Sequence, residues 1–254
     1  GANWLQNPES RAGMLYGKNT ATGQIDSVNL YQHETALNGP IFHNGRNEGY
    51  NLGASGGTDA ARYFLSGSYD NDVGIVSWNW DRKFTGRANV DALVGQKVNL
   101  QGNVSYIRDR IRLAQVGGID ADPFSQLVWG TPLTLGRVQR GFNQTPPEEW
   151  PTVQNRYSTD RTTMSLTATH NPWSWFSQRL VTGLDVGNED NYLLYPRQPL
   201  GNLDPLGNNG LGSKNDQRAN RTILTLDYSA NAKYNWRNAF DFTTISDIVL
   251  ELDY

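Results

Sequence analysis

Long runs of alternating apolar and polar residues constrain the fold of this chain more than any other feature of its sequence. In residues 83–94 every second residue is apolar or small, and the residues between them are polar apart from Leu93. The same alternation occurs in residues 98–106, 224–234 and 248–254. A repeat of two residues is the repeat of a β-strand, so each run predicts a strand with one apolar and one polar face.

Eight strands are predicted from this pattern. Several are longer than the roughly 5–6 residues typical of soluble sheets. They match the roughly 9–11 residues that a tilted strand needs to cross a bilayer. The predicted strands are residues 47–56, 61–71, 82–94, 97–109, 161–170, 175–189, 219–233 and 238–254.

The connections between these strands alternate strictly between short and long. This is the arrangement of an up-and-down transmembrane β-barrel, which has tight periplasmic turns and long extracellular loops. We therefore predict an all-β, antiparallel, up-and-down barrel segment. The short connections are residues 57–60, 95–96, 171–174 and 234–237, and the long ones are residues 72–81, 110–160 and 190–218.

Composition excludes several other classes. The formal net charge is −3, so no basic surface predicts nucleic-acid binding. Cysteine is absent, which removes disulfides and thiol chemistry. No apolar run approaches the roughly 18 residues of a membrane helix. The mean hydropathy of −0.62 is compatible with a barrel, because alternating strands average apolar and polar residues.

Aromatic residues cluster near the predicted strand ends. This distribution is typical of two interfacial girdles around an apolar band, although core aromatics beside turns would give the same pattern. Trp173, Trp175 and Trp236 lie at short turns with Tyr63 nearby, and Tyr69 and Tyr106 lie at the opposite strand ends.

An ordered series of motifs resembles a known family. YNLGASGGTD at residues 50–59 is followed by RYFLSGSY at 62–69, DVGIV at 72–76 and RKFTGRANV at 82–90. Together these resemble the early barrel of SusC/RagA-like TonB-linked (TonB-dependent) outer-membrane proteins, within a block of residues 41–109. The later strands fit the same class by pattern only.

The resemblance implies a nutrient transporter in the bacterial outer membrane, with a barrel of about 22 strands occluded by a plug. It also implies energy supplied through the TonB complex, a surface substrate-binding lipoprotein as partner, and substrates of the glycan or peptide class. We interpret residues 47–254 as a partial barrel within lipid. We interpret residues 1–46 as an irregular segment leading into it, with one irregular strand around residues 24–30.

Two other classes stay open. A complete eight-stranded outer-membrane barrel would have a structural or adhesion role. A soluble β-rich binding domain or enzyme would need the apolar face buried against protein. Small residues such as Gly86, Ala88, Ala92 and Gly102 make that face thin for a packed core. The sequence predicts no catalytic residues, cofactor or metal ligands.

Two groups of residues are candidates for contact with a solute. Aromatic side chains of the extracellular loop region would stack on a ligand, unless they pack within the loop itself. These are Trp129, Phe142, Trp150 and Tyr157. Charged residues on the polar faces would line the lumen, or form salt bridges with one another or with a plug. These are Arg62, Lys83, Arg87, Asp91, Asp109, Arg179, Asp185 and Asp227.

Overall fold

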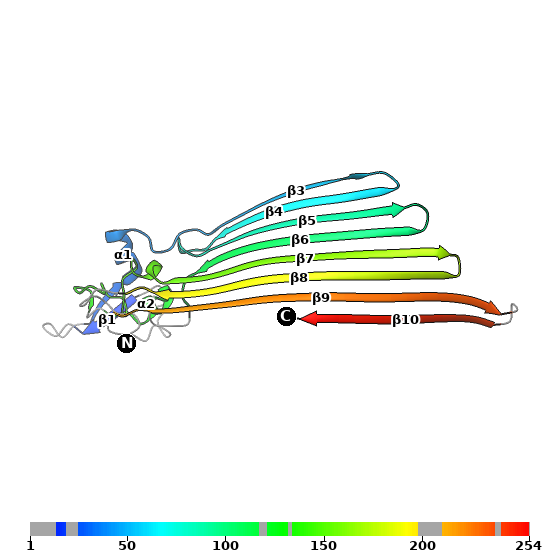
Figure 1. Ribbon diagram of the computed structural model, residues 1–254. Helices are drawn as coiled ribbons and strands as arrows, with labels where there is room; N and C mark the ends of the chain where they lie inside the picture. The colour runs from blue at the N-terminus through cyan, green and yellow to red at the C-terminus, as the bar shows by residue number, and fades with distance from the viewer. Residues whose placement is uncertain are drawn as a thin grey trace.

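A computed structural model of the chain describes residues 14–18, 25–116, 121–131, 134–197, 210–236 and 240–253. Its main feature is one antiparallel sheet of eight strands, paired in the order in which they occur along the chain (Figure 1). The strands are β3 (Arg46–Gly57), β4 (Ala61–Val73), β5 (Trp80–Val94), β6 (Val98–Leu113), β7 (Gln154–Trp173), β8 (Phe176–Tyr195), β9 (Ser213–Trp236) and β10 (Phe240–Asp253).

Small elements lie outside this sheet. β1 (Met14–Lys18) pairs antiparallel with β2 (Ile25–Asn29), and the helix α1 (Leu30–Asn38) follows β2 directly. The long β6–β7 connection contains the short helix α2 (Pro123–Val128) and a 3-10 turn, η3 (Trp150–Thr152). None of the described helices has the length and apolar content needed to cross a membrane.

The predicted fold class is confirmed, and each predicted strand overlaps an observed one. The main corrections concern the long connections, which are shorter than predicted. β7, β8 and β9 extend to 20, 20 and 24 residues. The extensions of β7 and β9 are mainly polar on both faces, whereas that of β8 ends in apolar residues on both faces (residues 192–195), so none of them shows the apolar–polar alternation of a strand.

The helix α1 was also missed. Asn29 caps its N-terminus by accepting a hydrogen bond from the backbone N–H of Gln32 at 3.0 Å. Only Leu30 and Glu34 of this helix are buried. A single apolar residue on the buried face leaves almost no helical periodicity in the sequence.

Cross-strand register gives the sheet two distinct faces. Leu65, Ala88, Val104 and Met164 are consecutive partners across β4 to β7, and all lie on what we call the apolar face. Leu65 and Met164 are 47% and 43% exposed, so no described residue covers them. We call the opposite side the polar face. This sheet therefore presents its apolar side chains to the surroundings and not to a protein core.

The sheet is open at both edges. β3 pairs only with β4, and β10 pairs only with β9, so no ladder joins β3 to β10 among the described strands. The tight turns gather at one end of the strands, and α1 and α2 lie at the other (Figure 1). The described strands therefore do not close into an eight-stranded barrel.

One short turn depends on glycine. Gly57 has a φ of +143°, and a Cβ there would lie 2.2 Å from the Ala61 carbonyl oxygen. We expect Gly57→Ala to destabilise the β3–β4 hairpin by about 1–3 kcal/mol, because both backbone strain and steric overlap oppose it. Gly95 has a φ of +64° but open space around it, so Gly95→Asn is the matched control. Urea unfolding of the intact protein in detergent measures both, and equal effects would contradict this account of the turn.

Candidate functional site

A compact hydrophobic core lies at the end of the sheet where the long connections gather. We call this part the cap; it comprises α1 with residues 39–45, residues 74–79, and the described parts of 114–153. The core unites segments far apart in sequence. Its buried members are Leu30, Ala121, Leu127, Phe142, Trp150, Val153 and Tyr195.

Hydrogen bonds between buried groups hold the β6–β7 connection in one conformation inside the cap. The buried Gln126 side chain accepts hydrogen bonds from the backbone N–H groups of Gln144 and Thr145, at 2.7 and 3.0 Å. The indole N–H of Trp150 donates to the Thr145 carbonyl at 3.1 Å. Buried polar groups that are satisfied in this way favour a single arrangement over a mobile loop.

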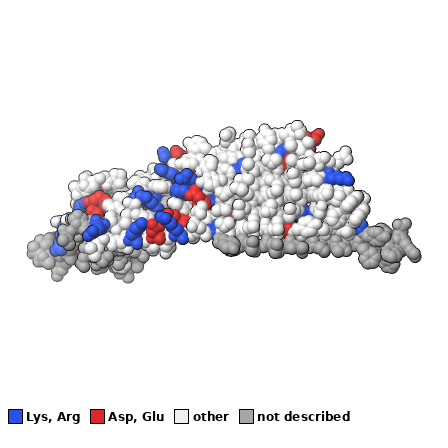
Figure 2. Space-filling model, viewed as in Figure 1, with Lys and Arg blue, Asp and Glu red and all other residues white. Residues whose placement is uncertain are grey.

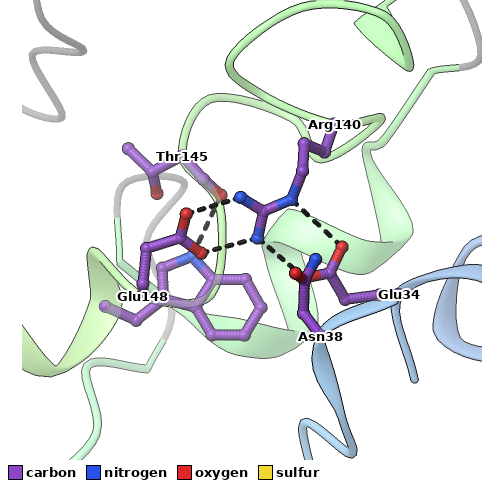
Figure 3. Close-up of polar contacts among 6 residues, drawn as sticks. Glu34, Asn38, Arg140, Thr145 and Glu148 are labelled. Carbon is purple, nitrogen blue, oxygen red and sulfur yellow. Dashed lines mark hydrogen bonds and ion pairs between the residues drawn. The ribbon is translucent and has the colours of Figure 1, made fainter. Parts of the chain in front are cut away.

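Arg140 is the residue around which the cap is organised. Its φ is +50°, the only positive value recorded for a non-glycine residue in the described part of the chain. Such backbone conformations persist only where the surrounding structure imposes them, and they concentrate at functional sites. Figure 3 shows the Arg140 side chain lying between two carboxylates, Glu34 from α1 and Glu148 from the β6–β7 connection.

The Arg140 guanidinium uses four N–H donors on these carboxylates. Nε and one Nη donate to the two oxygens of Glu34 at 3.2 and 2.7 Å. The same Nη donates to Glu148 at 2.6 Å, and the other Nη donates to the second Glu148 oxygen. Asn38 donates to Glu34 at 2.9 Å. The Glu34 side chain is only 2% exposed, so Arg140 neutralises a buried charge.

A cavity of about 500 Å³ lies against this network. Two carboxylates face one guanidinium there, which gives the three ionised groups a net charge of −1. Apolar groups from α1's C-terminal side and from the β4–β5 connection complete the lining. The lining residues are Glu34, Asn38, Gly39, Pro40, Ile41, Ser77, Trp78, Arg140, Pro147 and Glu148. A cationic or hydrogen-bonding ligand in this cavity would meet a net negative charge and the indole ring of Trp78.

The Glu148 carboxyl makes the stability of the cap depend weakly on pH. Its hydrogen bonds from Arg140 lower its pKa below the ordinary value of 4.5. The stability that the Glu148–Arg140 ion pair gives the cap is therefore fully present above pH 4.5, and it is lost as the pH falls through the lowered pKa of Glu148. We expect amide protection in α1 to decrease at acidic pH by less than about 1 kcal/mol, because the Glu148 side chain is 57% exposed. Hydrogen exchange measures this, and Glu148→Gln should abolish the acid step.

The predicted aromatic ligand residues separate into two groups. Phe142 and Trp150 are buried, with ring centroids 5.4 Å apart in an edge-to-face arrangement, so they pack within the cap. Their proposed stacking on a ligand is incompatible with this burial. Trp129 is 63% exposed and Tyr157 is 38% exposed. These two rings retain free surface for a ligand.

The register places all eight predicted lumen residues on the polar face. Arg62 is opposite Asp91, and Lys83 is opposite Asp109. The others occupy equivalent alternate positions of their strands: Arg87 on β5, Arg179 and Asp185 on β8, and Asp227 on β9. The strand alternation in the sequence therefore identified one continuous polar surface.

Some charged side chains on the polar face form ion pairs with one another. The Arg161 guanidinium donates from Nε to Asp185 at 2.9 Å and pairs with it again through an Nη atom. Thr163 donates to the same carboxylate at 3.4 Å. A groove of about 280 Å³ lies beside this pair and is bordered by Arg221 and Glu189. The partner of Asp185 is therefore Arg161, which is not one of the eight residues predicted to line the lumen.

The sequence analysis did not identify the ion pairs of Arg140 with Glu34 and Glu148. Glu34 and Arg140 are 106 residues apart, so no local spacing connects them. The Arg140–Gly141 pair also gives no distinctive motif. Only the docking of α1 onto the β6–β7 connection reveals the site.

The open sheet, its two faces and its one-ended cap define the fold as a segment of an up-and-down β-barrel wall, and solved structures with a similar fold are known. No protein-family description and no curated protein matches the sequence. Among solved structures, the RagAB peptide importer in its open-open state superposes with a TM-score of 0.59 over 84% of this chain, at 14% identity. The closed-closed state gives 0.58 over 79%, and a further RagAB peptide transporter structure gives 0.56 over 82%, each at 14% identity. The chain spans 24–25% of the length of these RagAB chains.

Proposed function

We propose that this chain forms part of the wall of a TonB-dependent nutrient transporter in the bacterial outer membrane. The observation that carries the proposal is the continuous apolar face, exposed from Tyr63 on β4 to Leu226 on β9. A water-soluble protein rarely exposes a contiguous apolar surface beyond a few hundred Å². Lipid is the environment that such a face fits.

The height of the apolar face supports a membrane crossing. On β8 it extends from Phe176, beside the stacked Trp173–Trp175 pair, to the polar Asn188. At roughly 3.3 Å per residue and a tilt of about 40°, this segment spans about 30 Å. The hydrocarbon core of a bilayer is about 30 Å thick. Aromatic residues mark both limits, with Tyr69 and Phe84 near the cap end.

The two open edges favour a larger barrel over a complete eight-stranded one. Unpaired backbone N–H and C=O groups in lipid cost several kcal/mol each, so a membrane sheet has to close. β3 and β10 do not pair with each other in the described structure. Further strands would therefore pair with both edges, as in the barrel of about 22 strands that the family resemblance implies.

In this arrangement the tight turns lie in the periplasm and the cap lies outside the cell. The polar face would line the lumen, where a plug and the solute path would lie. Trp129 and Tyr157 would contact substrate near the cap. Substrates of the peptide or glycan class, energy from the TonB complex and a surface lipoprotein partner complete the proposal, which assigns no enzymatic reaction. The structural similarity to the RagAB peptide importer favours peptides over glycans as the substrate class.

Cell fractionation followed by uptake assays tests this function. The intact protein should be recovered with outer membranes and require detergent for extraction. Cells lacking it should lose import of its nutrient, with labelled oligopeptides and oligosaccharides as the two probes. Recovery in the soluble fraction without detergent would refute the membrane assignment. Unchanged uptake of both probe classes, with the protein in the membrane, would refute the transport assignment.

A further inference from the structure

Charged side chains form a belt on the apolar face where the strands approach the cap. One face of the molecule in Figure 2 shows charged groups gathered beside a largely uncharged area. By register, the belt begins at the row of Tyr69, Phe84 and Arg108 and continues toward the cap. Its cations are Arg46, Arg82, Arg108, Arg110, Arg112, Arg156, Lys214 and Arg218, and its anions are Glu48, Asp160, Asp190 and Asp216.

The belt is electropositive in an acidic chain. Eight cations against four carboxylates leave a net charge of +4, whereas the whole chain carries −3. The carboxylates already have partners: Asp160 pairs with Arg108 and Arg110, and Arg218 pairs with Asp190 and Asp216. The excess positive charge therefore concentrates on the remaining arginines.

Two pairs of arginines lie directly opposite each other across strands. Arg82 is the cross-strand partner of Arg110, and Arg112 is the partner of Arg156. Like charges in this position are destabilising. No ion pair joins Arg82, Arg112 or Arg156 to any residue in the described ranges. A neutralising anion from outside the chain would relieve the repulsion.

The hydrogen bonding of these arginines is incomplete. Arg112 donates one Nη to the Pro151 carbonyl at 2.7 Å, but its buried Nε has no acceptor among the described groups. Arg156 is exposed beside it. An aromatic residue flanks the pair on each side of the same row, Trp80 next to Arg112 and Tyr192 next to Arg156. Arg82 also lies over the Trp80 ring, 4.5 Å from its centroid.

We propose that this belt binds anionic, phosphate-bearing headgroups of membrane lipids. The site rests on the proposed function, because the apolar face has to lie in lipid for the belt to reach the headgroup layer. The belt begins where the apolar rows end, and tryptophan and tyrosine favour the same interface. Guanidinium groups bind phosphate oxygens through paired, charge-assisted hydrogen bonds. The lipid acyl chains would then lie along the apolar face below.

Native mass spectrometry of the intact protein in detergent tests this proposal. The probes are phosphatidylglycerol and phosphatidylcholine with the same acyl chains. In the double variant Arg112→Gln/Arg156→Gln, affinity for phosphatidylglycerol should fall about 30-fold, because two basic side chains leave the headgroup layer. Affinity for phosphatidylcholine should change little. The corresponding double lysine variant should recover most of the loss, since it keeps the charge.

The matched control removes the same charge from the opposite face. Arg62→Gln/Arg87→Gln should leave the phosphatidylglycerol affinity unchanged, because these positions lie on the polar face. An equal loss in the control, or no loss in the belt variant, would overturn the proposal. Displacement of the lipid by an equal concentration of inorganic phosphate would assign the arginines to a soluble anion and also overturn it. These outcomes concern lipid affinity alone, whereas failure of the proposed function would appear as recovery of the protein in the soluble fraction or as unchanged uptake of both nutrient probes.

Discussion

Replacing Met164 with arginine should lower the free energy of unfolding in a bilayer by about 2–4 kcal/mol, because an arginine would then face hydrocarbon near mid-membrane. Met164 lies in the centre of β7 between Val104 and Leu184, and its side chain is 43% exposed on the apolar face. Urea unfolding of the intact protein in phospholipid vesicles measures the change. The cost arises from lipid and not from lost packing, since the site already has open space.

Two controls separate this explanation from a general effect of arginine. Thr167→Arg lies on the same strand but on the polar face, beside Gln101, and should cost little. Asn188→Arg lies on the apolar face at the cap-side limit of the band, where the penalty should fall to about 0–1 kcal/mol. Equal costs at Met164 and Asn188 would show that the face is covered by protein, because a lipid environment makes the penalty depend on depth.

Removing Arg140 should have the largest effect in the cap. In Arg140→Met, the carboxylate of Glu34 would be left buried without its cationic partner, which typically costs about 3–5 kcal/mol. The core of the cap depends on α1 docking through this contact. We therefore expect hydrogen-exchange protection of α1 amides to fall by a factor of about 100 or more, while β5 and β6 remain protected.

A second substitution tests the cause. Arg140→Met combined with Glu34→Gln removes the buried charge and should recover a large part of the lost protection. Arg137→Met removes a nearby exposed arginine from the same connection and should have little effect. If the double variant is as unprotected as the single one, lost packing by Arg140 and not the unpaired carboxylate would explain the result.

The sheet was predictable because its determinants are local. The pleat of a strand repeats every two residues, so the runs around Phe84, Val104 and Leu226 revealed both the strands and their faces. Short connections such as residues 95–96 then fixed antiparallel hairpins between neighbours. The same logic placed Arg62 and Asp227 on the polar face, because each occupies a polar position in the alternation of its own strand.

Prediction failed where local periodicity ended. The extensions of β7 to β9 lack apolar–polar alternation, because those of β7 and β9 are mainly polar on both faces and that of β8 ends in apolar residues on both faces, so they were assigned to loops. Phe142 and Trp150 were candidates for exposed rings, but the cap buries them against each other. A single sequence gives the type of an aromatic residue in a long connection, but its burial depends on which distant segments pack around it.

By itself, the sequence determined an antiparallel sheet with an apolar and a polar face, because strand alternation is a local property of the chain. Only the tertiary structure decided that Arg112 lies opposite Arg156, since pairing across β6 and β7 depends on how the connection of residues 114–153 folds. It alone brought Glu34 to Arg140, because a buried ion pair forms when helix and loop dock and leaves no trace in the spacing of either.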